Sequence, residues 1–368
     1  MGSRRHPVGV AGARACPGCL RRAWLLGALS GHLDRIRPRL GQVLALGDEE
    51  LLAALGGRRR RRLEGELAHF DAGAARSCAA EAGVGLICRC DPEYPRRLAC
   101  LESAPAVLHV AGGVQRFLTL AAADPVAIVG ARRASPYGLD VARSLGRGLA
   151  SAGLTVVSGM ALGIDSAAHR GALSVDGPTI AVLPAGADRS SARRTLFRRL
   201  EAGGAAVSEL PPGVSVRRWM FPARNRIIAA LAAMTVVVEA GERSGALITA
   251  RFARELERPV GAVPGRISSP GAAGPNELLA RGARLVRGPQ DVLDAVFGSG
   301  ARTASPDPRP ELDPELGRVL SAIASGRDTP GLLGRGGFTA ERALAAIAAL
   351  ELAGYVRREP GGRFAVVP

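Results

Sequence analysis

The sequence predicts an α/β protein: a doubly wound, mostly parallel sheet with a small helical domain before it and a winged helix after it. Three observations lead to this prediction. Short apolar runs alternate with helical stretches about six times after residue 126. The region before them carries apolar residues at helical spacing. The C-terminal region ends in helices that are followed by a hairpin pattern.

The N-terminal region, residues 1–105, is predicted to be the small helical domain. Residues 24–70 form short helices, because apolar side chains recur at the spacing of one helix face. Asp48, followed by two glutamates, is a suitable helix start, since acidic residues favour a first turn. For the run of five arginines from Arg58 to Arg62, a solvated loop and a phosphate contact both remain open.

The central region, residues 106–298, is predicted to hold the sheet. Its apolar runs are nearly continuous, as in parallel strands that are buried on both faces. Most of them end in Gly, Pro or an acidic residue, which marks the turn into the next helix. The runs are VAIVG, LTVVSG, TIAVLP, AAVSEL, MTVVVEA and PVGAVPG.

The C-terminal region divides into a linker and a small domain. Residues 299–311 are rich in Gly, Ser, Pro and Arg, a composition that is typical of linkers. Residues 312–368 contain two or three helices and then two short strand patterns around a Pro-Gly-Gly turn, which indicates a winged helix. Thr339 is a suitable N-cap for the last of these helices.

The composition permits a globular protein with an anionic partner. The chain has 368 residues, 47% of them apolar, which is enough for two or three domains with packed cores. The formal net charge is +16, and the 49 basic residues are all arginines, because the sequence contains no lysine. A pI near 11.2 favours a polyanion as partner. Codon bias in a GC-rich genome is the alternative source of the arginines, and composition alone does not separate the two.

The chain shows no transmembrane run, because the apolar stretches near Leu25 and Val236 are short and interrupted. Its start, where Arg4 and Arg5 precede Gly, Pro and more Arg, is unlike a signal peptide. We therefore expect a cytoplasmic protein without a membrane partner, in which the six cysteines are thiols and not disulfides.

Four of the cysteines fall in two close pairs. Cys16 and Cys19 form a CPGC motif, and Cys88 and Cys90 form a CRC motif. A zinc site from these four is an alternative, but CxC spacing is unfavourable for a tetrahedral knuckle. We therefore expect no metal, and interpret these cysteines as small buried hydrophobic residues.

The segments that follow the predicted strands are rich in glycine and arginine. In open α/β sheets, ligands bind outside the carboxyl ends of the strands. Glycine-rich loops, the N-termini of the following helices and guanidinium groups together bind phosphate. The residues predicted to contact the ligand at this edge are Gly130, Arg132, Arg133, Ser158, Gly159, Gly163, Arg189, Phe221, Arg224, Asn225, Arg226, Arg243, Ser244 and Gly245.

The segment that begins at Phe221 concentrates charge at one expected helix start. Arg224 and Arg226 are expected to open this helix, so that its free N–H groups and one guanidinium meet phosphate. Because residues two apart do not share a helix face, the other arginine is expected to tie the segment to a neighbouring loop or to Glu239. For Phe221, burial against Trp219 and stacking on a base both remain open.

Motifs for nucleotide binding and catalysis are missing from this edge. VGARRASPYG does not match GxGxxG, and a Walker A motif is impossible without lysine. Ser158 lacks the GxSxG context of a nucleophile. Asp165 is interpreted as bracing its helix, and His169 as forming a structural hydrogen bond. We therefore predict no catalytic residue and no cofactor, with Glu239 as the one acidic candidate for an enzyme.

Five linked segments of the sequence resemble the DprA/Smf family, the DNA-processing proteins of bacterial transformation. They are VAIVGARRASPYG, SGMALGIDSAAH, FPARNRIIAAL, VVVEAGERSGALITA and GPNELLARGARLV. The match runs from about Asp91 to Leu293 and continues more weakly into the winged helix. AGADRSSARR departs from the family's GLDxxYP-type segment, and Pro178 stands where a lysine is usual.

The resemblance implies an extended Rossmann fold that binds single-stranded DNA without sequence preference. It also implies a homodimer, paired through the sheet edge that follows PVGAVPG, and a role in loading the RecA recombinase. It implies no catalysis.

Two other functions are kept as alternatives. A nucleotide phosphoribohydrolase-like enzyme needs an acidic catalytic residue, for which Glu239 is the candidate. A winged-helix transcription factor would use Arg357, Arg358 and Arg363 of the C-terminal hairpin for phosphate contact. The helix before this hairpin is rich in alanine and offers few side chains for reading bases, so a protein contact is an equal interpretation of that domain.

Overall fold

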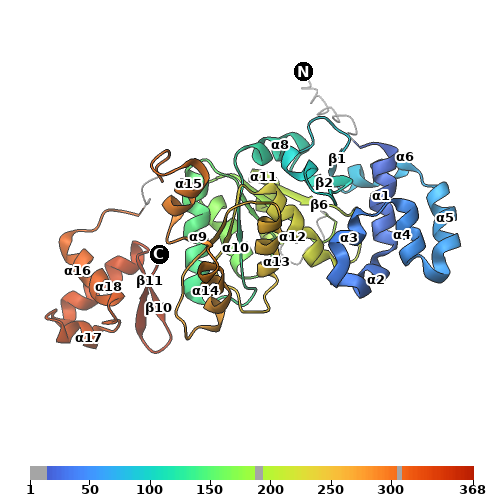
Figure 1. Cartoon of the computed structure of the whole chain (residues 1–368). Helices are drawn as coiled ribbons and strands as arrows, with labels where there is room; N and C mark the ends of the chain where they lie inside the picture. The colour runs from blue at the N-terminus through green and yellow to red at the C-terminus, as the bar shows by residue number, and fades with distance from the viewer. Residues whose placement is uncertain (1–14, 187–193, 305–308) are drawn as a thin grey trace, which may run out of the picture.

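The structure, a computed structural model, describes residues 15–186, 194–304 and 309–368. Its centre is a nine-stranded sheet (Figure 1). In order across the sheet, the strands are β1 (Gly85–Cys88), β2 (Val107–Ala111), β6 (Ala205–Ser208), β5 (Thr179–Val182), β4 (Val156–Ser158), β3 (Val126–Val129), β7 (Met234–Val237), β8 (Val260–Ala262) and β9 (Arg284–Leu285). The strands from β6 to β9 in this order are parallel, whereas β1 and β2 are antiparallel to their neighbours. The predicted doubly wound, mostly parallel sheet is confirmed.

The winding of the chain reverses at β3. From β3 the chain moves outward through β4, β5 and β6, and it then returns to β7 on the other side of β3. Val126 of β3 therefore lies between Val156 of β4 and Met234 of β7. Loops that leave the carboxyl ends of β3 and β7 diverge from this point, which is where open α/β sheets bind ligands.

Two helical layers cover the sheet, because successive residues of a strand point to opposite faces. In β3, Val126 and Ile128 enter one core, while Ala127 and Val129 enter the other. The helices α9 (Pro136–Ser151), α10 (Ile164–Leu173) and α15 (Pro289–Phe297) cover the first face, and α8 (Val114–Ala122), α12 (Met220–Leu231) and α13 (Ala246–Glu255) cover the second. The other helices of this region are α7 (Arg96–Ala99), α11 (Arg194–Gly203) and α14 (Ala273–Ala280).

The N-terminal residues form short helices, as predicted. They are α1 (Pro17–Ala28), α2 (Ser30–Leu33), α3 (Leu40–Ala45), α4 (Asp48–Leu55), α5 (Arg60–Ala68) and α6 (Ala72–Glu81). Their leucine core extends onto Trp219, whose indole Nε1 donates to Ser30 Oγ at 3.0 Å. The backbone N–H of Trp219 donates to the Asp34 carboxylate at 2.7 Å. The predicted domain boundary after residue 105 falls between β1 and β2, and these two strands pair in one sheet. The domain limits given from the sequence remain a prediction.

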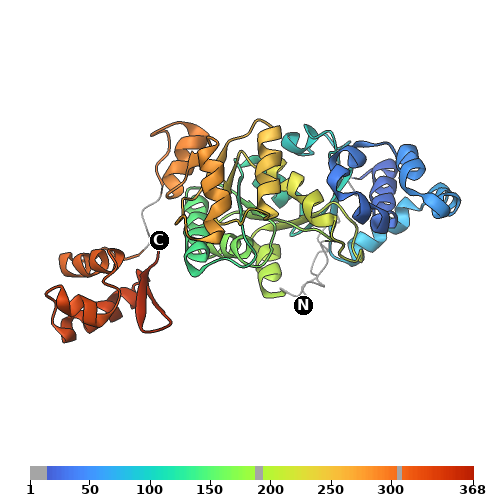
Figure 2. The same ribbon diagram turned by 60° about the horizontal axis from the view of Figure 1, so that its bottom comes forward.

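The C-terminal residues form a winged helix with its own core. It comprises α16 (Pro314–Ala324), α17 (Pro330–Arg335), α18 (Ala340–Leu352) and the antiparallel hairpin of β10 (Val356–Glu359) and β11 (Arg363–Val366). Thr339 caps α18, since its hydroxyl accepts the N–H of Arg342 at 3.3 Å. Figure 2 shows this domain, in red, at the opposite end of the molecule from the N-terminal helices, in blue. Among the described helices, none is both long and apolar enough to cross a bilayer.

Candidate nucleic-acid interface

A cavity of about 310 Å³ lies at the point where the winding reverses. The loops after β3, β4 and β7 and the first turns of α12 line it, so the elements that diverge at the switch point all contribute. The residues predicted from the sequence that line it are Gly130, Arg132, Phe221, Arg224, Asn225, Ser244 and Gly245. The sequence analysis did not assign Ala161, Pro222, Ile228, Ile248 and Thr249, which also line it. These five residues lie in the sequence segments that resemble the DprA/Smf family, and only this position in the sequence could have indicated them.

Arg224 lies in the wall of this cavity with a side chain that is only 7% exposed. Its guanidinium donates to the carbonyl oxygens of Gly159 and Val182, and it faces the Asp165 carboxylate at 3.5 Å. Its Nε also donates to Asn225 Oδ1 at 3.2 Å. Arg224 therefore fixes the ends of β4 and β5 and places positive charge beside the cavity.

Asn225 and Ser244 hold the loop that follows β7. The Asn225 Nδ2 group donates to the carbonyl oxygen of Gly245 at 3.1 Å. Ser244 Oγ accepts the N–H of Ala246, at the start of α13, at 3.3 Å. Asn225 thus braces the loop, which is one of the roles expected from the sequence.

Two buried ionisable side chains near Arg224, Asp165 and His169, have shifted pKa values. Burial raises the pKa of Asp165, while the Arg224 guanidinium acts in the opposite direction. Burial, with a smaller contribution from Arg224, lowers the pKa of His169 to about 3. His169 Nδ1 lies 2.7 Å from Thr179 Oγ1. His169 is therefore neutral at pH 7 and forms a structural hydrogen bond, in agreement with the sequence-based interpretation.

Arg226 does not reach the cavity. Its side chain is 2% exposed, and its guanidinium donates to Glu209 at 2.6 Å and to the carbonyl oxygen of Ala223 at 2.7 Å. Its Nε donates to Ser103. The prediction that Arg226 contacts the ligand is therefore corrected, because a buried guanidinium with these partners is part of the scaffold. The expected tie to Glu239 is also replaced by the ion pair with Glu209.

The helix start in this segment also differs from the prediction. α12 begins at Met220, so Arg224 and Arg226 lie in its second turn and their backbone N–H groups are not free. Pro222 lies inside the first turn, where the missing N–H removes no helical hydrogen bond. The expected anion-binding N–H groups at Arg224 and Arg226 are therefore absent from this helix.

Two glycines allow the loops after β3 and β4 to pack closely. A Cβ atom on Gly159 would lie 2.1 Å from the Arg224 guanidinium. Gly163 has a φ of +81°, and a Cβ atom there would lie 2.2 Å from the carbonyl oxygen of Ala131. Both glycines thus allow close contacts within the protein, and their predicted contact with the ligand stays a prediction.

Arg132 and Phe221 meet at the open side of the cavity. The guanidinium carbon of Arg132 lies 4.5 Å from the centre of the Phe221 ring, which is a cation–π distance. Phe221 is half-buried and lines the cavity, whereas Trp219 is buried in the core of the N-terminal helices. The alternative in which Phe221 is buried against Trp219 is not what the structure shows.

Glu239 is engaged by the start of α9. Its carboxylate accepts the backbone N–H of Ser135 at 2.8 Å and the Ser135 hydroxyl at 2.5 Å. A Cβ atom on Gly138 would lie 2.4 Å from this carboxyl group, so α9 approaches it with no space between. Glu239 therefore orders the loop after β3, and it is not among the residues that line the cavity.

Exposed arginines lie in the loops after β3 and β7 and in the segment that leads into α12, and one of them, Arg132, lines the cavity itself. These two loops and α12 supply most of the cavity lining. These residues, called the rim arginines below, are Arg132, Arg133, Arg217, Arg218 and Arg243. Among the described residues, no carboxylate forms an ion pair with any of them. Their charge is therefore available to an anionic ligand.

The remaining predicted residues have other surroundings. Ser158 is fully buried, and its hydroxyl donates to the carbonyl oxygen of Ile128 at 2.6 Å. Its predicted ligand contact is corrected to a bond between β4 and β3. Arg189 lies outside the described residues.

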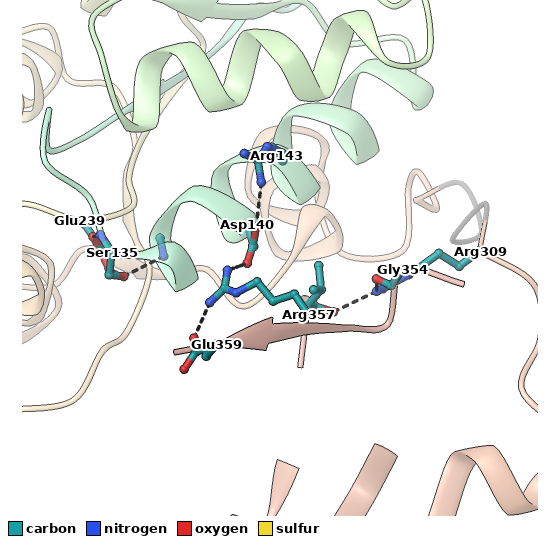
Figure 3. A network of polar contacts seen from close by, with 10 residues as sticks. Ser135, Asp140, Arg143, Glu239, Arg309, Gly354, Arg357 and Glu359 are labelled. Carbon is teal, nitrogen blue, oxygen red and sulfur yellow. Dashed lines mark hydrogen bonds and ion pairs between the residues drawn. The ribbon is translucent and has the colours of Figure 1, made fainter. Parts of the chain in front are cut away.

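The winged helix contacts the sheet domain through Arg357 (Figure 3). Its guanidinium pairs with Asp140 of α9 and, at 2.8 Å, with Glu359 of its own hairpin. Burial raises the pKa of Asp140, and the nearby Arg357 and Arg143 oppose this shift. Arg363 pairs with Asp328 at 2.6 Å. Two of the three hairpin arginines proposed for phosphate contact are therefore occupied by carboxylates.

The fold and this edge define a class of protein: a doubly wound α/β domain with an arginine-rich edge, joined to a winged helix. The family model described as "DNA recombination-mediator protein A" matches residues 85–297. The model described as "DprA winged helix domain" matches residues 303–362. The chain belongs to the DNA recombination-mediator protein A family, and the resemblance found in the sequence is confirmed.

Individual relatives agree with this assignment. The chain is 36% identical over 286 residues to "Protein Smf" of Escherichia coli strain K12, covering 73% of this chain and 74% of that protein. It is 44% identical over 209 residues to the "Putative DNA processing protein DprA" of Mycobacterium tuberculosis, covering 56% and 53%, so it spans about half the length of that relative. The X-ray structure of DNA processing protein A from Streptococcus pneumoniae superposes with a TM-score of 0.61 at 30% identity, covering 77% of this chain and 99% of the other.

Proposed function

We propose that this protein binds single-stranded DNA, without sequence preference, at the carboxyl edge of its sheet. One observation supports the proposal above the others: the five rim arginines are exposed on the segments that line the cavity or lead into them, and they pair with no carboxylate of the described residues. Guanidinium groups form paired hydrogen bonds with phosphate oxygens. A basic groove that follows the phosphate backbone supplies affinity that does not depend on sequence.

The same edge favours a single strand over a duplex. Phe221 is half-buried at the cavity, with Arg132 over its ring, so an aromatic face is close to the rim arginines. Stacking of an unpaired base on an aromatic side chain contributes about 1–3 kcal/mol and accepts any base. A duplex keeps its bases stacked on one another and cannot use this contact. The winged helix offers few side chains for contacting bases in a DNA groove, since α18 is rich in alanine and Arg357 is paired with Asp140.

A recombinase of the RecA type and a second copy of the chain are the partners that we propose. The family description, a recombination mediator, supports the first. For the second, β9 has only two residues at the end of the sheet, and Leu285 within it is 48% exposed. Ile267, in the loop that follows β8, is 99% exposed. Unpaired sheet edges with apolar side chains are usually covered, and pairing with a twin chain would cover this one.

We propose no catalytic role for this edge. The carboxylate of Glu239 is bonded to Ser135, and that of Asp165 faces Arg224, so neither is placed as a free acid or base. Steady release of base or phosphate from nucleoside monophosphates, abolished by Glu239→Gln, would instead favour the nucleotide phosphoribohydrolase alternative.

The proposal is tested by titrating labelled single-stranded and duplex oligonucleotides of equal length across a salt series. We expect tighter binding of the single strand, little dependence on its sequence, and a steep loss of affinity with salt. Equal affinity for both forms would contradict the preference for single strands. Tighter binding of one duplex sequence would favour the transcription-factor alternative.

A further inference from the structure

The four cysteines of the CPGC and CRC motifs meet at one point. The sulfur atoms of Cys16, Cys19, Cys88 and Cys90 all lie within 4.8 Å of one another, although Cys88 follows Cys19 by 69 positions in the sequence. The Sγ atoms of Cys19 and Cys90 are 3.6 Å apart. Cys78 and Cys100 are exposed and do not belong to this cluster.

We propose that these four cysteines bind a structural Zn²⁺ ion. Zinc bound by thiolates is tetrahedral with Zn–S distances of about 2.3 Å, so its sulfur ligands lie about 3.8 Å apart. The separations in the cluster, 3.6 Å for one pair and at most 4.8 Å for the rest, approach this spacing, and small side-chain rotations close the difference. Four sulfur ligands leave no open position, which is the arrangement of a structural and not a catalytic site.

The local backbone is suited to thiolates. Cys16 is the N-cap of α1 and Cys19 lies in its first turn, where the free N–H groups of the helix favour negative charge. The backbone N–H of Cys16 points at Cys88 Sγ, 3.4 Å away. Arg89 lines the adjoining cavity and would offset part of the negative charge that four thiolates leave on a divalent ion, whereas Arg21 in the same cavity is paired with Asp48.

The CxC spacing, which argued against a metal in the sequence analysis, is accommodated by the end of a strand. Cys88 is the last residue of β1, and Cys90 lies in the turn that follows. Because the chain bends between them, both sulfurs reach the same point. The expectation of no metal rested on this spacing and on the two further cysteines, Cys78 and Cys100, and neither reveals the bend.

The proposed ion would fasten the N-terminal helices to the sheet. α1 supplies two ligands, and the end of β1, the edge strand of the sheet, supplies the other two. Few large side chains join the two elements here, since the adjacent cluster consists mainly of Ala and Cys with Leu20, Leu86 and Val107. A metal that binds only the folded arrangement stabilises it in the way that a larger core would.

Disulfides are the competing use of the same sulfurs. One disulfide joins two sulfurs at about 2.05 Å and leaves the other two unexplained. A pair of disulfides within the motifs would not connect α1 to β1. A pair of disulfides between the motifs would bring only the bonded sulfurs together, whereas all four lie within 4.8 Å of one another. A di-iron cluster is too wide for this site, because all four sulfurs lie within 4.8 Å of one another. A single tetrahedral ion accounts for all four.

The test is the metal content of the full-length protein, purified with a thiol reductant and without chelator. Elemental analysis is expected to find about one zinc per chain. Cys19→Ser and Cys88→Ser should each lower this content at least fivefold. The matched control, Cys78→Ser with Cys100→Ser, should keep it. Zinc that persists in the first two variants, or iron in place of zinc, would overturn the proposal.

A second measurement keeps the proposal testable if the cysteine variants fail to fold. Cobalt added to metal-stripped wild-type protein is expected to produce the visible absorption of a tetrahedral cobalt–thiolate centre, and zinc is expected to displace it. The thermal midpoint should fall when the chelator is added and recover with zinc. A wild-type protein that carries no zinc and shows no cobalt–thiolate absorption would refute the site.

Discussion

Arg226 and Arg132 belong to the same ligand edge of the sheet in the sequence, but their surroundings in the fold are opposite. Arg226 is 2% exposed and bonded to Glu209 at 2.6 Å. Arg132 is exposed, lies over the Phe221 ring and pairs with no carboxylate of the described residues. The same side chain thus holds the scaffold in one place and offers charge to a ligand in the other. It follows that the count of 49 arginines overstates the number of guanidinium groups available to phosphate.

Arg226→Ala gives the largest expected effect on stability. It leaves the Glu209 carboxylate buried without its partner, and loss of one member of a buried ion pair costs about 3–5 kcal/mol. Urea unfolding is expected to show this loss. In the double variant Arg226→Ala with Glu209→Gln, part of it should return, because no buried charge is left alone. If Arg226→Ala were as stable as the parent protein, the claim that Arg226 holds the scaffold would be contradicted.

Gly159→Ala tests how tightly the interior is packed. The added Cβ would lie 2.1 Å from the Arg224 guanidinium, which would have to leave its carbonyl partners. We expect a loss of about 1–3 kcal/mol in unfolding free energy, as for other overpacked sites. Gly245→Ala is the matched control, since it lines the same cavity and has no atom within 4 Å of the added Cβ. Equal stability of the two variants would show that Arg224 is not held in place.

The rim is tested by Arg132→Ala, Arg133→Ala and Arg243→Ala in one variant. We expect at least a tenfold loss of single-strand affinity, about 1.4 kcal/mol or more, and a flatter salt dependence. Fluorescence anisotropy across a salt series measures both. The control replaces Arg58, Arg59 and Arg61, which removes the same charge from the N-terminal arginine run. An equal loss in this control would assign binding to net charge and not to the rim.

Arg357→Ala is expected to have the smallest effect. Its side chain is 26% exposed, and the buried Asp140 carboxylate keeps its ion pair with Arg143, so we expect a cost of about 1 kcal/mol. Loss of the pair with Asp140 should free the winged helix and speed proteolysis in the linker 299–311 severalfold. Arg358→Ala, an exposed neighbour, is the control. Unchanged cleavage in both variants would show that other contacts hold the domain.

The sequence predicted the architecture because its signals are local and repeated. Near-continuous apolar runs identified the buried parallel strands, and β3, β4, β5, β6, β7 and β8 all occur where these runs stand. The Gly-rich ends of these strands pointed to the correct edge of the sheet. Pairing of β1 with β2 was not predicted, because the pattern of a short strand does not encode its partner.

The individual roles at the edge could not be predicted in the same way. Arg224 and Arg226 are buried by partners that are far away in the sequence, Asp165 and Glu209. The sulfurs of Cys19 and Cys90 come within 3.6 Å although 71 positions separate them. Contacts over such separations depend on the packing of the whole domain, which residue spacing does not encode.

The most direct test of the account measures two quantities, unfolding free energy and single-strand affinity, in the rim variant and in Arg226→Ala. The account predicts opposite outcomes. The rim variant should lose at least tenfold in affinity and keep its stability, while Arg226→Ala should lose about 3–5 kcal/mol of stability and, where folded, bind as the parent does. If Arg226→Ala loses affinity while its stability is kept, or if the rim variant binds as the parent does, the assignment of scaffold and ligand surface is contradicted.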